Sequence, residues 1–70
     1  MTITKINYCS WEGTPAVSAY YPDGRILAYE YNDDKWVQVH EADVSTKAVL
    51  IGEAAFKKRW PDLVLPAFPE

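Results

Sequence analysis

The chain has 70 residues, of which 49% are hydrophobic, 24% charged and 14% aromatic. This balance excludes an intrinsically disordered chain, and the length predicts one small domain over residues 1–70. Cys9 is the only cysteine, which excludes an internal disulfide. A chain this small must therefore be stabilised by dense aromatic packing or by self-association.

The charge is unevenly distributed along the chain. Ten acidic and seven basic residues give a net charge of −3, but residues 1–43 carry −4 and residues 44–70 carry +1. An acidic first half argues against nucleic acid as a partner, because binding to nucleic acid depends on neutralising phosphates. It favours docking onto the basic surface of a larger protein.

Several features predict a cytoplasmic protein with no membrane partner. The first residues lack the apolar core of a signal peptide, and the longest apolar run, residues 48–51, is far too short to span a bilayer. A single cysteine in so small a chain is typical of a reducing compartment.

The first elements in the chain are predicted to be β-strands. Residues 2–8 are rich in β-branched types and predict a strand, and residues 9–15, with a glycine and a proline, predict a connection. Strands over 16–21 and 25–31 flank Pro22-Asp23-Gly24, which favours a three-residue hairpin loop with a left-handed glycine. That loop would set Ala19 opposite Leu27 and Val17 opposite Tyr29.

The second hairpin leaves two registers open, where the register is the set of residues that face each other across two strands. A three-residue loop over 32–34, with Asp34 left-handed, sets the next strand (35–41) so that Tyr29 opposes Val37. A two-residue loop instead sets Tyr31 opposite Trp36 and reverses the faces of this strand. We favour the first register because it gathers apolar residues on one face: Val17, Ala19, Leu27, Tyr29, Val37 and Val39.

The remaining residues predict a helix and a tail. Asp43 or Ser45 can cap the start of a helix, and Pro61 ends it at the preceding tryptophan. The alternative is a fifth strand over 47–51, a break at Gly52 and a short helix over 53–59. The tail has three prolines and apolar residues that would pack on the domain or form an interface. The predicted fold is therefore α+β: a three- or four-stranded antiparallel meander, one C-terminal helix and an extended Pro-rich tail.

The aromatic residues suggest a binding surface. Seven large rings lie in the first 36 residues, more than one small sheet with one helix can bury. Tyrosine and tryptophan are enriched where proteins bind each other. The favoured register leaves one sheet face uncovered, and the residues predicted to bind a partner there and in the adjoining acidic loop are Tyr20, Glu30, Asp33, Asp34, Trp36, Gln38 and His40. The competing interpretation is that the rings stiffen a thin core beneath the C-terminal tail.

The residues that could carry chemistry lack supporting motifs. Cys9 could be a nucleophile and His40 its general base, but neither lies in a catalytic or zinc-binding pattern. The acidic residues at 32–34 are consecutive, as in turns, rather than alternating as in a calcium loop. The three cations at 57–59 lie beside Trp60, a combination seen in nucleic-acid-binding surfaces, but they cover only one helical turn, which is a small area for such a surface. We therefore expect no catalytic residues, no metal and no cofactor.

The leading functional hypothesis is a non-catalytic protein-binding module of the inhibitor or adaptor type. One concrete form of it is a phage-encoded inhibitor of a bacterial defence complex, which rests on the small size and the lack of an active-site motif alone. The alternative is a self-associating protein that binds a small ligand or nucleotide at a homodimer interface, where two chains would supply the depth that one lacks.

Overall fold

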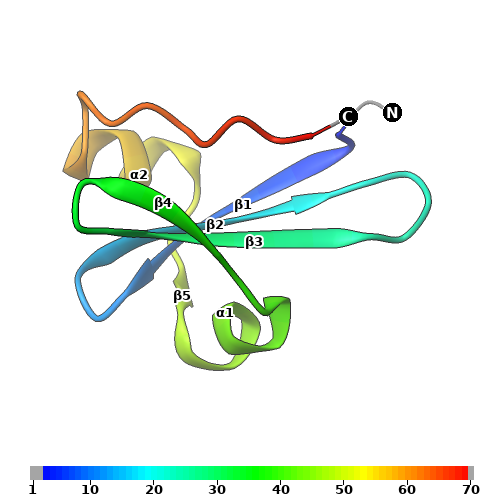
Figure 1. Ribbon diagram of the computed structural model, residues 1–70. Coiled ribbons are helices and arrows are strands. Elements are labelled where there is room, and N and C mark those ends of the chain that lie inside the picture. Colours follow the sequence, from blue (N-terminus) through cyan, green and yellow to red (C-terminus); the bar gives the residue numbers. More distant parts are fainter. Residues whose placement is uncertain (1–2, 70) are drawn as a thin grey trace.

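A computed structural model describes residues 3–69 and shows an α+β fold built on one antiparallel sheet (Figure 1). The sheet has five strands in the order β4-β3-β2-β1-β5, so the meander of the first four is confirmed and a fifth strand is added. Its strands are β1 (Lys5–Trp11), β2 (Thr14–Tyr20), β3 (Ile26–Asn32), β4 (Lys35–Val39) and β5 (Val49–Leu50).

The tight turn of the β1–β2 hairpin was not predicted from the sequence, which indicated a longer connection over residues 9–15. The predicted strand over 2–8 begins at residue 2, outside the described residues, and β1 runs on to Trp11 through part of the expected connection. A two-residue turn follows, in which Glu12 and Gly13 have φ of 52° and 82°. Positive φ at both positions suits the twist of paired strands. The ladder between β2 and β3 begins at Ala16, immediately after Pro15, so the proline does not interrupt it.

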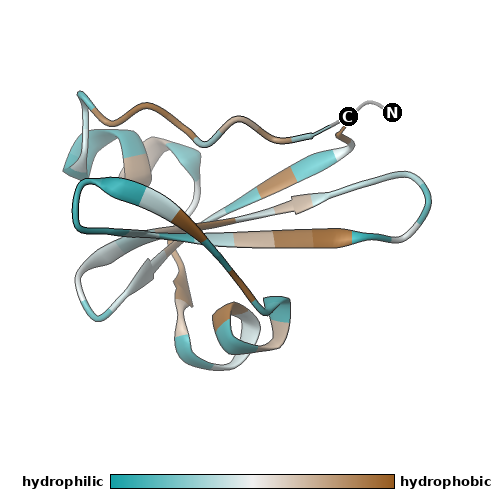
Figure 2. Cartoon of the chain, viewed as in Figure 1, coloured by the Kyte–Doolittle hydropathy of each residue, from teal (hydrophilic) through white to brown (hydrophobic). Residues whose placement is uncertain are grey.

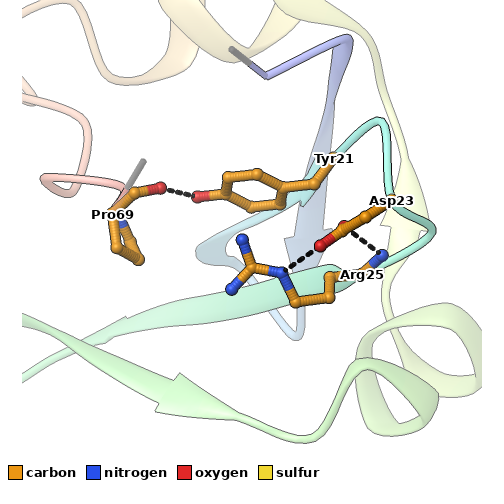
Figure 3. Close-up of polar contacts among 4 residues, drawn as sticks. All are labelled: Tyr21, Asp23, Arg25 and Pro69. Atoms are coloured by element: carbon orange, nitrogen blue, oxygen red, sulfur yellow. Dashed lines mark hydrogen bonds and ion pairs between the residues drawn. The ribbon is translucent and has the colours of Figure 1, made fainter. Parts of the chain in front are cut away.

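The β2–β3 hairpin agrees with its prediction. Val17 lies opposite Tyr29 and Ala19 opposite Leu27. The Tyr21 amide donates to the Arg25 carbonyl at 2.9 Å, and Gly24 closes the loop with φ of 93°. The Asp23 carboxylate accepts hydrogen bonds from the Arg25 amide (3.1 Å) and from its side-chain Nε (3.0 Å), which fixes the loop (Figure 3).

The favoured register of the β3–β4 hairpin was wrong. Tyr31 lies opposite Trp36 and Glu30 opposite Val37, as the two-residue loop requires. Asp33 and Asp34 form this turn, with φ of 52° and 62°. Aspartate tolerates the left-handed region better than most residues, and a turn with two such residues matches the twist of the strands. This local constraint decided the register against the hydrophobic pattern.

The observed register distributes the predicted residues over both faces of the sheet. Val37 and Val39 lie on the face of Ala28 and Glu30, whereas Trp36 and Gln38 lie on the face of Tyr29. The predicted uncovered face does not exist, because α1 packs on one side of the sheet and α2 with the tail on the other (Figure 1).

Two short helices replace the single predicted helix. They are α1 (Glu41–Lys47) and α2 (Glu53–Arg59), separated by β5 as in the alternative interpretation. His40, rather than Asp43 or Ser45, caps α1, and its Nδ1 accepts a hydrogen bond from the Ala42 amide at 3.2 Å. Gly52 precedes α2 with φ of 85°, a conformation that glycine adopts easily and that interrupts any continuous helix.

A small core lies between the sheet and α1. It consists of Cys9, Ala16, Ala28 and Val44, which are almost fully buried. Trp11, Val39 and Ala48 pack around this cluster and close it. The small side chains on β1, β2 and β3 allow Val44 of α1 to approach the sheet closely.

The opposite face is covered by aromatic side chains and by the tail. Phe56 of α2 is 2% exposed and packs against Tyr8, with ring centroids 5.3 Å apart. Pro61 and Asp62 form a turn in which the Leu63 amide donates to the Trp60 carbonyl at 3.2 Å. From residue 63 the chain is extended and crosses the sheet, and its apolar stretch is visible above the strands in Figure 2. Phe68 meets the edge of Tyr29 at 5.5 Å, Trp36 Nε1 donates to the Val64 carbonyl at 2.7 Å, and the Tyr21 hydroxyl donates to the Pro69 carbonyl (Figure 3).

The turn between β3 and β4 supplies the first prediction. Asp34→Gly should raise the free energy of unfolding by about 0.5–1 kcal/mol, because glycine adopts positive φ without steric cost. Asp34→Val should lower it by about 1–2 kcal/mol, because a β-branched residue is strained there. Urea denaturation measures both, and equal effects of the two variants would contradict the observed turn.

The anchoring of the tail supplies the second prediction. Trp36→Phe keeps an aromatic ring but removes the donor to the Val64 carbonyl, so stability should fall by about 1 kcal/mol. Amide hydrogen exchange should quicken in residues 63–68 more than in the sheet. Uniform quickening across the protein would show that the tail has no separate anchor at this tryptophan.

Candidate functional site

The predicted partner-binding residues lie in several parts of the surface. Tyr20 lies at the end of β2 on the α1 side, where Asn7 Nδ2 donates to its hydroxyl at 3.1 Å and Lys5 Nζ lies 4.6 Å from its ring centroid. Glu30 lies on the same face, opposite Val37. His40 caps α1. These residues do not form one cluster with Trp36 and Gln38, which project on the other side of the sheet.

Two of the predicted residues, Asp34 and Trp36, do come together in a groove. This hairpin–tail groove lies between the β3–β4 hairpin and the tail and has a volume of about 550 Å³. Tyr31 and Trp36 meet edge to face in it, with centroids 5.2 Å apart. The groove is lined by Tyr29, Tyr31, Asp34, Lys35, Trp36 and residues 62–67.

The groove adjoins the most acidic part of the chain. Between residues 30 and 46 there are five acidic residues and one lysine, so this segment carries −4 while the whole chain carries −3. Asp33 and Asp34 lie at the start of β4, and Glu41 and Asp43 follow its end in the first turn of α1. Asp62 of the tail adds a further carboxylate to the groove. An acidic surface with exposed aromatic edges suits a basic binding partner.

Sequence reasoning missed the contribution of the tail to this site. Tyr31 and Asp62 line the groove, but neither was predicted to bind a partner, and residues 63–67 of the tail were expected only to pack on the domain or to form an interface. The available signal was the apolar character of the tail, which indicated packing across the domain without indicating where. The predicted alternative, in which the tail covers the rings, agrees with the contacts of Trp36 and Tyr29.

The two residues considered for catalysis have structural roles. Cys9 is 6% exposed beneath α1, and burial raises the pKa of its thiol. A raised pKa keeps the thiol protonated and unreactive near neutral pH. His40 Nδ1 accepts the hydrogen bond that caps α1. The structure therefore gives both side chains a part in the packing around α1.

Two of the three basic residues at the end of α2, Lys57 and Arg59, also have local partners. Lys57 Nζ lies 2.8 Å from Glu53 Oε2 one turn earlier, and Arg59 Nη1 donates to Ser10 Oγ at 3.0 Å. The Arg59 guanidinium also lies 5.6 Å from the centroid of the Trp60 ring. These contacts attach the end of α2 to β1 and to its own last turn.

Residues 3–69 contain no group of three or more histidine, cysteine, aspartate or glutamate side chains placed to hold a metal ion. None of the helices in that range has the length and apolar character needed to cross a membrane. Comparison with protein-family models, curated proteins and solved structures gave no match to this chain.

The burial of Cys9 supplies the third prediction. At pH 8 the native thiol should react with a disulfide reagent at least tenfold more slowly than in denaturant, because burial disfavours the thiolate. The folded pKa is raised, so the folded state retains the proton longer, and stability should fall as pH rises through the ordinary thiol pKa.

Stability measured between pH 7.5 and about 9.5 checks the second part of this prediction, with Cys9→Ala as the control that lacks the thiol. The variant should show a flatter pH dependence than the parent protein. Equal reactivity of the native and denatured thiol would show that Cys9 is accessible.

Proposed function

We propose that this protein is a non-catalytic protein-binding module of the inhibitor or adaptor type. It binds a basic surface of a larger protein partner through the β3–β4 hairpin and the hairpin–tail groove. The observation that supports this most directly is the concentration of negative charge around β4 beside the aromatic groove. Aromatic side chains supply contact area with few rotatable bonds, and the carboxylates supply attraction and orientation.

The proposal narrows the predicted binding surface. Asp33, Asp34 and Trp36 lie at or beside the groove, and Gln38 lies further along the same strand on the same face. Tyr20 lies on the α1 face of the sheet, so it is assigned no direct contact with this partner. A bacterial defence complex, as the target of a phage-encoded inhibitor, is one partner that capture would identify.

The fourth prediction tests this surface by removing its charge without altering its turn. Asp33→Asn with Asp34→Asn keeps two residues that tolerate positive φ and removes two carboxylates. Affinity capture from the native host followed by mass spectrometry identifies the partner, and titration with the purified partner measures affinity. The double variant should bind about tenfold more weakly, with most of the difference disappearing in high salt.

The matched control is Glu12→Asn in the turn between β1 and β2. Glu12 also has a left-handed φ of 52° in a two-residue turn, but it lies on a different hairpin. This variant should bind the partner as the parent protein does. Equal affinities of the double variant and the control would show that the acidic hairpin is not the binding surface.

A further inference from the structure

We propose that the partner supplies an extended segment that pairs with the free edge of β4, adding a strand to the sheet, and that lysine or arginine side chains of this segment face the acidic groups around β4. This inference rests on the proposed function and specifies how the surface is used. Strand addition is a common form of peptide recognition, in which main-chain hydrogen bonds give affinity and alternating side chains give specificity.

The two edges of the sheet differ in how well they are protected. β5 contains only two residues, and a very short edge strand offers little to an added chain. β4 contains five residues and is the last strand at the other edge of the sheet that residues 3–69 form. Among residues 3–69, no main-chain hydrogen bond joins the tail to β4, and the hydrogen bond between them comes from the Trp36 side chain, which donates to the Val64 carbonyl.

The turn geometry defines which groups β4 offers to an added strand. Asn32 and Lys35 flank the two-residue turn and form the closing pair of the hairpin. In an antiparallel ladder every second pair exchanges hydrogen bonds, so the amides and carbonyls of Trp36 and Gln38 point away from β3. These amides and carbonyls form a row along the outer edge of β4, with which an incoming strand can form main-chain hydrogen bonds.

The side chains beside this edge specify the chemistry of the segment. On one face, Trp36 leads into the groove, where two carboxylates, of Asp34 and Asp62, outnumber the one cation, Lys35. A lysine or arginine side chain of the added strand would meet both the aromatic ring and negative charge there. On the other face, Val37 is 37% exposed, which suits an apolar side chain at the alternate positions of the added strand.

A second copy of this chain is the less suitable occupant of the edge. If two β4 strands paired antiparallel, the turn of each would approach the end of β4 in the other. Asp33 and Asp34 of one copy would then lie near Glu41 of the other, and like charges placed opposite each other are destabilising. A basic segment instead finds carboxylates at both ends of β4.

The fifth prediction uses a defined probe, an eight-residue peptide of alternating lysine and valine with both termini blocked. Titration into the ¹⁵N-labelled protein should give saturable shifts centred on the β4 amides and slower hydrogen exchange at Trp36 and Gln38. Affinity should fall with rising salt. The same peptide with glutamate in place of lysine should bind at least tenfold more weakly.

Two further changes, one in the protein and one in the peptide, test whether binding depends on main-chain hydrogen bonds or only on attraction between charges. Gln38→Pro removes an amide that points outward, a position where an edge strand tolerates proline, and should weaken binding about tenfold. Gln38→Ala keeps that amide and removes only the side chain, so the proline variant should bind at least fivefold more weakly than the alanine variant. Because the proline variant could unfold, the lysine–valine peptide with N-methylated alternate residues is also titrated into the unchanged protein, where it should not bind.

The outcomes separate this inference from the proposed function. Unchanged binding of the N-methylated peptide would overturn strand addition while leaving a charge-driven protein-binding surface intact. Absence of β4 shifts with the lysine–valine peptide would also overturn it, even if the captured partner still distinguishes the Asp33/Asp34 variant from its control. Concentration-dependent dimerisation that protects Trp36 and Gln38 without peptide would assign the edge to a second copy and overturn the basic segment.

Discussion

The two-residue turn at Asp33 and Asp34 is the constraint on which the arrangement of the surface depends. Two consecutive residues with positive φ set Tyr31 opposite Trp36, and this register decides which face each side chain of β4 occupies. A slip of one residue would place the valines of β4 against the tail and Trp36 against α1. The same turn leaves the backbone of β4 as a regular, unpaired edge.

The fold achieves stability by covering a thin sheet on both faces with small elements. On one face, small side chains allow Val44 of α1 to pack closely over β1, β2 and β3. On the other face, Phe56 and the extended tail cover the larger rings. The rings of Tyr29 and Trp36 therefore have two roles, because they hold the tail in place and form the wall of the hairpin–tail groove.

Negative charge is concentrated around β4. The segment around β4 is strongly acidic. At the end of α2, Lys57 forms an ion pair with Glu53, and Arg59 donates a hydrogen bond to Ser10. Of the two residues considered for catalysis, Cys9 packs in the core and His40 caps α1. In the proposed function, the partner therefore binds at the β3–β4 hairpin and the adjoining tail, where a sheet edge, aromatic rings and carboxylates lie together.

The sequence alone determined the features that depend on neighbouring residues. Pro22-Asp23-Gly24 specified its hairpin and register, the order of strands specified the meander, and Pro61 specified where α2 ends. The break at Gly52 and the course of the tail were decided only in the tertiary structure, whereas the register of β4 was set by the turn at Asp33 and Asp34 against the hydrophobic pattern. In each case local patterns allowed two solutions, and backbone strain, pairing of β5 with β1 or packing against distant rings selected one. Asp62 and Tyr31 enter the groove for that reason, since residues far apart in the chain become neighbours only when the tail crosses the sheet.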